Sequence, residues 1–140
     1  MSKLVEFKVS FRICDDKLNP LEITELLGIT PDLAHRKGDP NASISKKGKL
    51  IVYSPFSTGL WSIHAKEESN TDLEQQIKSL LSVLYPLKDS LLKLSRRGYK
   101  MDIFCGAFTD ASVFGFEIKP DTLLWLGELN IKLGLDIYTH

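Results

Sequence analysis

The sequence predicts an α+β fold: a two-layer α/β sandwich with a mostly antiparallel sheet of about six strands and helices on one face. Several segments alternate apolar and polar residues, which is typical of a strand with one buried face. Other segments repeat apolar residues at helical spacing. Each strand has only one apolar side, so helices are needed on one face only. We therefore expect a single domain over residues 1–140, a usual domain length.

The first strand and helix have the clearest signals. Apolar side chains occupy every second position over Val5–Ile13, which predicts a strand. Asn19 is the expected N-cap of a short helix that begins at Pro20. Gly28 suits the left-handed position that ends such a helix.

The next part of the chain predicts a loop and a hairpin. Residues 30–49 are rich in Gly, Pro, Ser, Asn and Lys, and we interpret them as an ordered surface loop. Residues 50–53 and 60–65 each look like a short strand, with a Pro- and Gly-containing turn between them. We expect these two strands to pair as a β-hairpin.

A long amphipathic helix follows, with Asn70 or Thr71 as the expected N-cap. Leucines and an isoleucine continue at helical spacing from Leu73 to Leu94. Pro86 interrupts this stripe because it lacks a backbone N–H. We expect one helix kinked at Pro86, with two abutting helices as the alternative.

The C-terminal part predicts two strands, a helix and a final strand. Residues 99–105 and 113–118 alternate like strands, Pro120 opens a helix that ends at Asn130, and residues 131–137 alternate again. The predicted order is β-α-β-β-α-β-β-α-β. Its first six elements have ferredoxin-like order.

Composition favours a protein of the cytoplasm. Lys plus Arg equals Asp plus Glu, at 18 each, so the chain lacks the basic excess of nucleic-acid binders, and we expect no nucleic-acid partner. No long apolar run predicts a membrane span or a signal peptide, and we expect no membrane partner. Two cysteines are too few for a disulfide scaffold. The three histidines lack metal-like spacing, so we expect neither a metal nor a cofactor.

Several short signatures, taken in order, resemble a known bacterial family, domain of unknown function 4279. They are Phe11-Arg12-Ile13, Ile23-Thr24 with Leu27-Gly28 and Pro31, Arg36-Lys37-Gly38-Asp39, Gly59 with Trp61, Leu73 with Leu80-Leu81, and Asp136-Ile137-Tyr138. The resemblance covers nearly the whole chain. It implies one complete domain and supplies no catalytic residue, because the family has no established activity.

One candidate binding site is the basic segment 35–49. Arg36, Lys37, Gly38 and Asp39 could hold a phosphate or carboxylate through backbone N–H groups and cationic side chains. The lysines Lys46, Lys47 and Lys49 follow. No P-loop spacing is present. The alternative interpretation, which we favour, is a solvated loop with a turn at Gly38-Asp39.

A second candidate is the uncovered sheet face. Asp136 and Tyr138 alternate with apolar residues in the last strand, as Lys8 and Arg12 do in the first. We expect these side chains to line the face opposite the helices, which could bind a partner. The alternative is a plain solvent-facing sheet.

The remaining candidates are single residues. His64 is expected at the surface or edge of a strand, and Trp61 in the core, although both are also binding candidates. Cys14 and Cys105 are expected to be buried and inert. A Cys105–His64 pair brought together by the fold is the one nucleophilic arrangement we consider.

These observations favour a binding module whose partner is another protein, of which an immunity protein is one form. The alternative is a small-ligand or anion-binding module that uses the basic segment 35–49. An enzyme with a site assembled from distant segments is the third hypothesis, and no residue is assigned a catalytic role.

Overall fold

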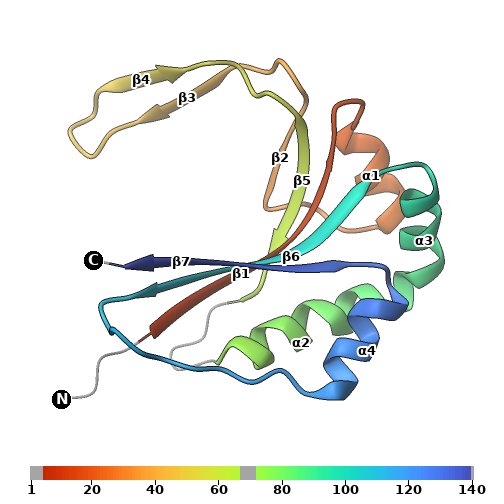
Figure 1. The fold of residues 1–140 in the computed structure, drawn as a ribbon. Coiled ribbons are helices and arrows are strands. Elements are labelled where there is room, and N and C mark those ends of the chain that lie inside the picture. The colour runs from red at the N-terminus through yellow and green to blue at the C-terminus, as the bar shows by residue number, and fades with distance from the viewer. Residues whose placement is uncertain (1–4, 67–71, 140) are drawn as a thin grey trace.

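A computed structural model describes residues 5–66 and 72–139, and Figure 1 shows the fold. The strands are β1 (Val5–Asp15), β2 (Leu33–His35), β3 (Asn41–Ile44), β4 (Leu50–Tyr53), β5 (Gly59–His64), β6 (Lys100–Thr109) and β7 (Lys132–Thr139). The helices are α1 (Pro20–Leu27), α2 (Leu73–Leu84), α3 (Lys88–Arg96) and α4 (Pro120–Glu128), with a 3-10 turn η1 (Tyr85–Leu87). Among the described residues, no helix is both long and apolar enough to cross a membrane. The predicted α+β class is confirmed.

Five strands form one sheet in the order β2-β5-β1-β6-β7. The central strand β1 pairs antiparallel with both β5 and β6, and β2 pairs antiparallel with β5. Among the strands of the described residues, only β7 is parallel to its neighbour, β6. β3 and β4 pair separately as an antiparallel hairpin that projects from the β2–β5 side of the molecule (Figure 1). The prediction of a mostly antiparallel sheet is thus confirmed.

The helices cover one face of the sheet, as predicted (Figure 1). Alternate side chains of β1 and β6 point toward this helical layer, so that Phe11, Ile13 and Ile103 are fully buried. They belong to one hydrophobic core with buried residues of α2 such as Ile77 and Leu81. No helix formed by the described residues covers the other face of the sheet.

Local capping signals predicted the ends of the short helices correctly. The Asn19 side chain accepts a hydrogen bond from the Leu21 N–H (3.2 Å) at the start of α1. Gly28 ends this helix with φ 69°, and its N–H donates to the Thr24 carbonyl (2.8 Å). Asn130 has φ 57°, which is the left-handed conformation expected after α4.

The N-cap of α2 differs from the prediction. Asp72 caps this helix, and its side chain accepts a hydrogen bond from the Gln75 N–H (2.8 Å). The predicted caps, Asn70 and Thr71, lie outside the described residues. An aspartate suits this position because its charge also interacts favourably with the positive end of the helix dipole.

Pro86 divides the long helical segment. The α-helical hydrogen bonding of α2 gives way to the 3-10 turn η1, and α3 resumes at Lys88. The missing N–H of Pro86 explains the interruption. The structure therefore lies closer to the alternative of two abutting helices than to one kinked helix.

The predicted hairpin of residues 50–53 with 60–65 is wrong. β4 pairs instead with β3, from within the segment predicted as a loop. Both edges of β5 are occupied, one by β1 and the other by β2. Because a strand has only two hydrogen-bonding edges, β5 has no edge left for β4.

The predicted strand at residues 113–118 does not form. Since β6 pairs with β1 on one edge and with parallel β7 on the other, no sheet edge beside β6 is free. A parallel neighbour requires a crossover connection, and this segment is part of it. Its alternating aromatic residues pack against the sheet instead: Phe114 and Phe116 each contact the edge of Phe7, with ring centroids 6.4 Å apart.

Candidate functional site

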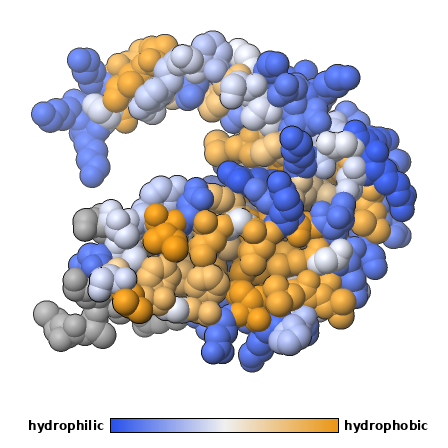
Figure 2. Space-filling model, viewed as in Figure 1, coloured by the Kyte–Doolittle hydropathy of each residue, from blue (hydrophilic) through white to orange (hydrophobic). Residues whose placement is uncertain are grey.

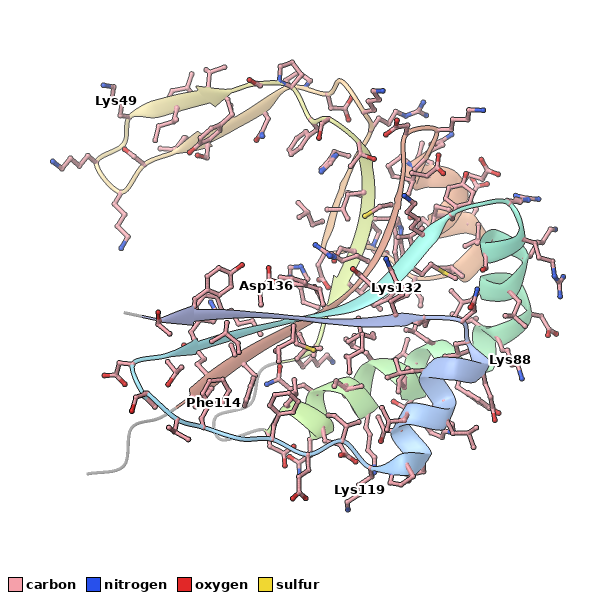
Figure 3. All side chains as sticks on the ribbon, viewed as in Figure 1. Lys49, Lys88, Phe114, Lys119, Lys132 and Asp136 are labelled. Atoms are coloured by element: carbon pink, nitrogen blue, oxygen red, sulfur yellow. The ribbon has the colours of Figure 1, made fainter. Side chains whose placement is uncertain are left out.

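The uncovered side of the five-stranded sheet carries charged and aromatic side chains. We call it the open face. It consists of Glu6, Lys8, Ser10 and Arg12 of β1, His64 of β5, Lys100, Asp102, Phe104 and Phe108 of β6, and Lys132, Asp136 and Tyr138 of β7. Figure 3 shows Lys132 and Asp136 on this side of β7, whereas Phe114 and Lys119 lie on the helical side. The period-two alternation predicted this grouping of Lys8, Arg12, Asp136 and Tyr138.

Arg12 and Asp102 form a bidentate ion pair at the centre of the open face. Arg12 Nε donates to Asp102 Oδ1 (2.9 Å), and Arg12 Nη2 donates to Asp102 Oδ2 (2.7 Å). The hydrogen bond to Asp102 raises the pKa of Arg12 above its usual value. The guanidinium also lies 4.3 Å from the ring centroid of Phe104. These contacts fix a permanent cation over the sheet.

A second group lies toward the C-terminal end of β7. Phe108 and Tyr138 stack with ring centroids 4.9 Å apart and an interplanar angle of 13°. Lys8 Nζ lies 5.5 Å from the Phe108 centroid. The Tyr138 hydroxyl donates to Asp136 Oδ2 at 3.4 Å. Aromatic, basic and acidic groups are therefore interleaved over neighbouring strands.

A shallow depression of about 250 Å³ lies between these groups. Its lining includes Lys8, His64, Phe104, Phe108 and Tyr138. This volume lies below the usual range for small-molecule sites, roughly 300–1,000 Å³, and suits a single inserted side chain. His64 is exposed at its rim, as predicted, and the His64 backbone N–H donates to Asp32 Oδ2 (2.7 Å).

The β3–β4 hairpin, residues 41–53, forms the second part of the candidate site, and we call it the arm. Its aliphatic side chains are unusually exposed: Ile44 by 73%, Leu50 by 62% and Val52 by 73%. By cross-strand register these three residues share one face of the arm. At its tip, Lys46 and Lys47 lie in a turn closed by a hydrogen bond from the Ser45 N–H to the Lys49 carbonyl (2.8 Å).

The arm stands over the open face. Figure 2 shows a hollow between the arm and the body of the molecule, and Figure 1 shows the arm on the side of the sheet opposite the helices. Lys49 marks the tip of the arm in Figure 3. The arm and the open face thus border one concave surface, which has aromatic and charged residues on its sheet side.

The base of the arm is joined to the sheet through Phe56. The Gly38 N–H donates to the Phe56 carbonyl (2.8 Å), and the Phe56 N–H donates to the Asp39 carbonyl (3.1 Å). The Phe56 ring stacks on His35, with centroids 3.5 Å apart. These contacts are local, so the position of the arm depends on a few residues.

The predicted anion site at residues 36–39 is a self-contained turn. The Arg36 N–H donates to Asp39 Oδ2 (2.8 Å), and the Asp39 N–H donates to the Arg36 carbonyl (3.1 Å). The Gly38 N–H is engaged by Phe56, as described above, and Lys37 Nζ contacts Asp16 Oδ2 (3.3 Å). The backbone donors expected for an anion are therefore used within the protein. The lysines at the arm tip are separated from this turn by the length of β3 and β4.

Trp61 lies in the core and not on a surface. Its side chain is fully buried, its ring meets that of Phe11 edge to face, and its Nε1–H donates to Thr24 Oγ1 (3.1 Å). The predicted core packing is confirmed, and the indole joins α1 to the sheet.

The Cys105–His64 pair does not form. Cys105 is buried among the core residues of β6, on the helical side, whereas His64 lies on the open face. Burial raises the pKa of the Cys105 thiol to about 12. Burial also raises the pKa of Cys14, which is half-buried. Among residues 5–66 and 72–139, no cluster of three His, Cys, Asp or Glu side chains could hold a metal ion.

Sequence reasoning missed part of this surface. Asp102, Phe104 and Phe108 alternate with buried residues of β6, and the period-two pattern could have placed them on the open face. The exposed arm residues Ile44 and Val52 had a weaker signal, because exposed and buried aliphatic residues look alike in a sequence. A Gly at position 48, with φ 78°, marks the hairpin turn.

Comparisons with known proteins identify the family to which the chain belongs but do not assign it a function. A family model described as "Domain of unknown function (DUF4279)" matches residues 5–140. No curated protein and no solved structure matches the chain. The family match extends over the sheet, the helices and the arm, so all of these elements fall within one family domain.

Proposed function

We propose that this chain, which belongs to the DUF4279 family, is a binding module that holds another protein between its open face and its arm. One observation carries the proposal: a sheet face with aromatic and charged side chains is left uncovered beneath an arm whose aliphatic residues face solvent. Contiguous exposed apolar residues mark interaction sites in soluble proteins. Tyr and Arg, which the open face supplies at Tyr138 and Arg12, are enriched among the residues that dominate binding energies.

The energetics of the arm support this role. An isolated two-stranded hairpin is only marginally stable in water. Ile44 and Val52 are each 73% exposed, so their full burial would contribute roughly 1.5–3 kcal/mol per side chain. A partner that covers the arm would therefore both gain affinity from it and stabilise it.

An immunity protein is one concrete form of this function. Such a protein acts by masking a surface of a toxin, which requires binding alone. We expect the protein to act in the cytoplasm, where Cys14 and Cys105, which form no disulfide, stay reduced.

Capture from a lysate of the source organism tests the proposal when matched surface variants are used in parallel. The open-face variant carries Lys132→Glu and Tyr138→Ala. The control carries Lys93→Glu, the same change of charge at an exposed position of α3. We expect wild type and control to retain one stoichiometric partner, identified by mass spectrometry, and the open-face variant to lose it.

Circular dichroism of each variant establishes that the fold is intact. A folded open-face variant that retains the partner as well as wild type does would contradict the proposal. So would loss of the partner from the Lys93→Glu control alone, because the partner would then bind the helical side.

A further inference from the structure

The proposed binding surface is basic, although the whole chain is neutral. The open face and the arm together hold seven Lys or Arg residues against three carboxylates, whereas the chain has 18 of each. The basic residues are Lys8, Arg12, Lys100 and Lys132 of the sheet with Lys46, Lys47 and Lys49 of the arm. Residues 41–53 contain no Asp or Glu. The compensating negative charge therefore lies elsewhere on the molecule.

Most of this positive charge has no carboxylate partner within the protein. Asp102 is engaged by Arg12 through both of its oxygens. Within the described parts of the chain, Lys8, Lys132 and the three arm lysines make no ion pair. A partner that supplies carboxylates would meet unpaired cations on the open face and at the tip of the arm.

The surface suits a polypeptide better than a nucleic acid. Single-stranded nucleic acids bind by stacking bases on free aromatic faces. Here Phe104 already lies under the Arg12 guanidinium, and Phe108 is flanked by Lys8 and Tyr138. The exposed aliphatic residues of the arm would gain little from phosphates, but they match apolar side chains.

From this combination we infer that the partner contributes an acidic segment in which apolar side chains alternate with carboxylates. This inference rests on the proposed function and names the chemistry of the partner. The carboxylates would face Lys8, Lys132 and the lysines of the arm tip. One apolar side chain would enter the depression beside Phe104 and Tyr138, whose volume fits a single residue.

Fluorescence anisotropy with labelled synthetic probes tests this inference. The probes are a 12-residue peptide that repeats Glu-Tyr-Glu-Leu, its counterpart with Lys in place of Glu, and a 12-nucleotide oligothymidine. We expect the acidic peptide to bind, with an affinity that falls about tenfold between low and moderate salt as screening increases. We expect much weaker binding of the other two probes.

Two matched triple variants test where the peptide binds. The arm variant reverses the charge of the arm tip through Lys46→Glu, Lys47→Glu and Lys49→Glu. The helical-side variant makes the same change of charge through Lys88→Glu, Lys93→Glu and Lys119→Glu. Figure 3 shows Lys88 and Lys119 on that side. The arm variant should weaken acidic-peptide binding about tenfold. The helical-side variant should stay within about twofold of wild type, because distant charges are screened.

Three results would overturn the inference: no binding of the acidic peptide, equal binding of the Lys peptide, or equal losses from both triple variants. Tighter binding of the oligothymidine would replace it with a nucleic-acid partner. The two proposals can fail separately, since a captured protein that is lost with Lys132→Glu/Tyr138→Ala would uphold the open face even if the acidic peptide did not bind.

Discussion

Arg12 and Asp102 sit directly opposite each other in the β1–β6 ladder, and their side chains close a bidentate ion pair on the open face. The pair lies on the face of the sheet opposite the buried core, and both of its side chains are partly exposed. It therefore links the stability of the fold to the charge of the proposed binding surface.

Neutralising the carboxylate should change stability and binding in opposite directions. Asp102→Asn removes an ionic partner of Arg12, and we expect the free energy of unfolding in urea to fall by about 1 kcal/mol. The same change leaves the guanidinium uncompensated, so the acidic peptide should bind a few-fold more tightly. Glu25→Gln removes one negative charge from α1 and should change neither quantity appreciably. Weaker binding by Asp102→Asn would contradict the electrostatic account.

The hydrogen bond from Trp61 to Thr24 should matter for stability alone. Thr24→Val removes the acceptor of the buried indole N–H, and an unsatisfied buried donor costs about 1–3 kcal/mol. Thr30→Val makes the same replacement at an exposed position and should leave the urea midpoint nearly unchanged. A large loss of partner binding by folded Thr24→Val would show that α1 contributes to the interface, against our account.

Two Gly→Ala changes should have opposite signs. A Cβ at Gly59 would lie 2.6 Å from the Asp15 carbonyl oxygen and 2.9 Å from Leu18 Cβ, so we expect Gly59→Ala to destabilise the protein by about 1–3 kcal/mol. Gly127 lies in α4 with open space around it, and Gly127→Ala should stabilise the protein by about 0.5 kcal/mol. Thermal unfolding followed by circular dichroism distinguishes them. A Gly59→Ala protein as stable as wild type would contradict the close approach of β5 to residues 15–18.

The two thiols should react with a disulfide reagent at very different rates. The pKa of Cys105 is raised to about 12, so its thiolate is almost absent from the native protein at pH 8–10, whereas half-buried Cys14 remains partly accessible. Native protein should therefore release one equivalent of chromophore, and the second only after denaturation. Two equal native rates would contradict this assignment.

The same raised pKa gives a pH dependence of stability. In the unfolded chain the thiol of Cys105 ionises near pH 8.5, whereas in the folded protein it keeps its proton to about pH 12. The unfolded state therefore binds fewer protons above pH 8.5, and stability should fall as pH rises toward 12. Urea unfolding at pH 7.5, 9 and 10 should show a shallower decline for Cys105→Ala than for wild type. Equal declines in the stability of wild type and Cys105→Ala would show that ionisation of Cys105 does not contribute to the pH dependence.

Local features of the fold could be predicted from the sequence, and pairing between distant segments could not. Strand β1 and the ends of α1 follow from alternation and capping, which involve neighbouring residues. Residues 113–118 alternate in the same way as β1 but pack Phe114 and Phe116 on Phe7 without joining a ladder. Alternation reports that one side of a segment is buried, and it does not report which edge, if any, the backbone pairs with.

The candidate site shows the same division. Arg12, Asp136 and Tyr138 could be assigned to the open face because the apolar residues of each strand mark its buried side. The residues that alternate with them must then lie on the opposite side. The arm could not be foreseen, since the sequence predicts a loop over residues 30–49 and pairs residues 50–53 with the nearest following strand. The turn at residues 36–39 illustrates a third limit: only the structure shows that Asp39 and Phe56 already occupy its backbone groups.

Site-specific photo-crosslinking in the lysate tests the central claim, that the open face holds a protein partner. A benzophenone amino acid replaces Tyr138 on the open face or Leu124, which is 60% exposed on α4, on the helical side. We predict a discrete crosslinked adduct from position 138 and none from position 124. An adduct from position 124 alone, or no adduct from either folded protein, would contradict the claim.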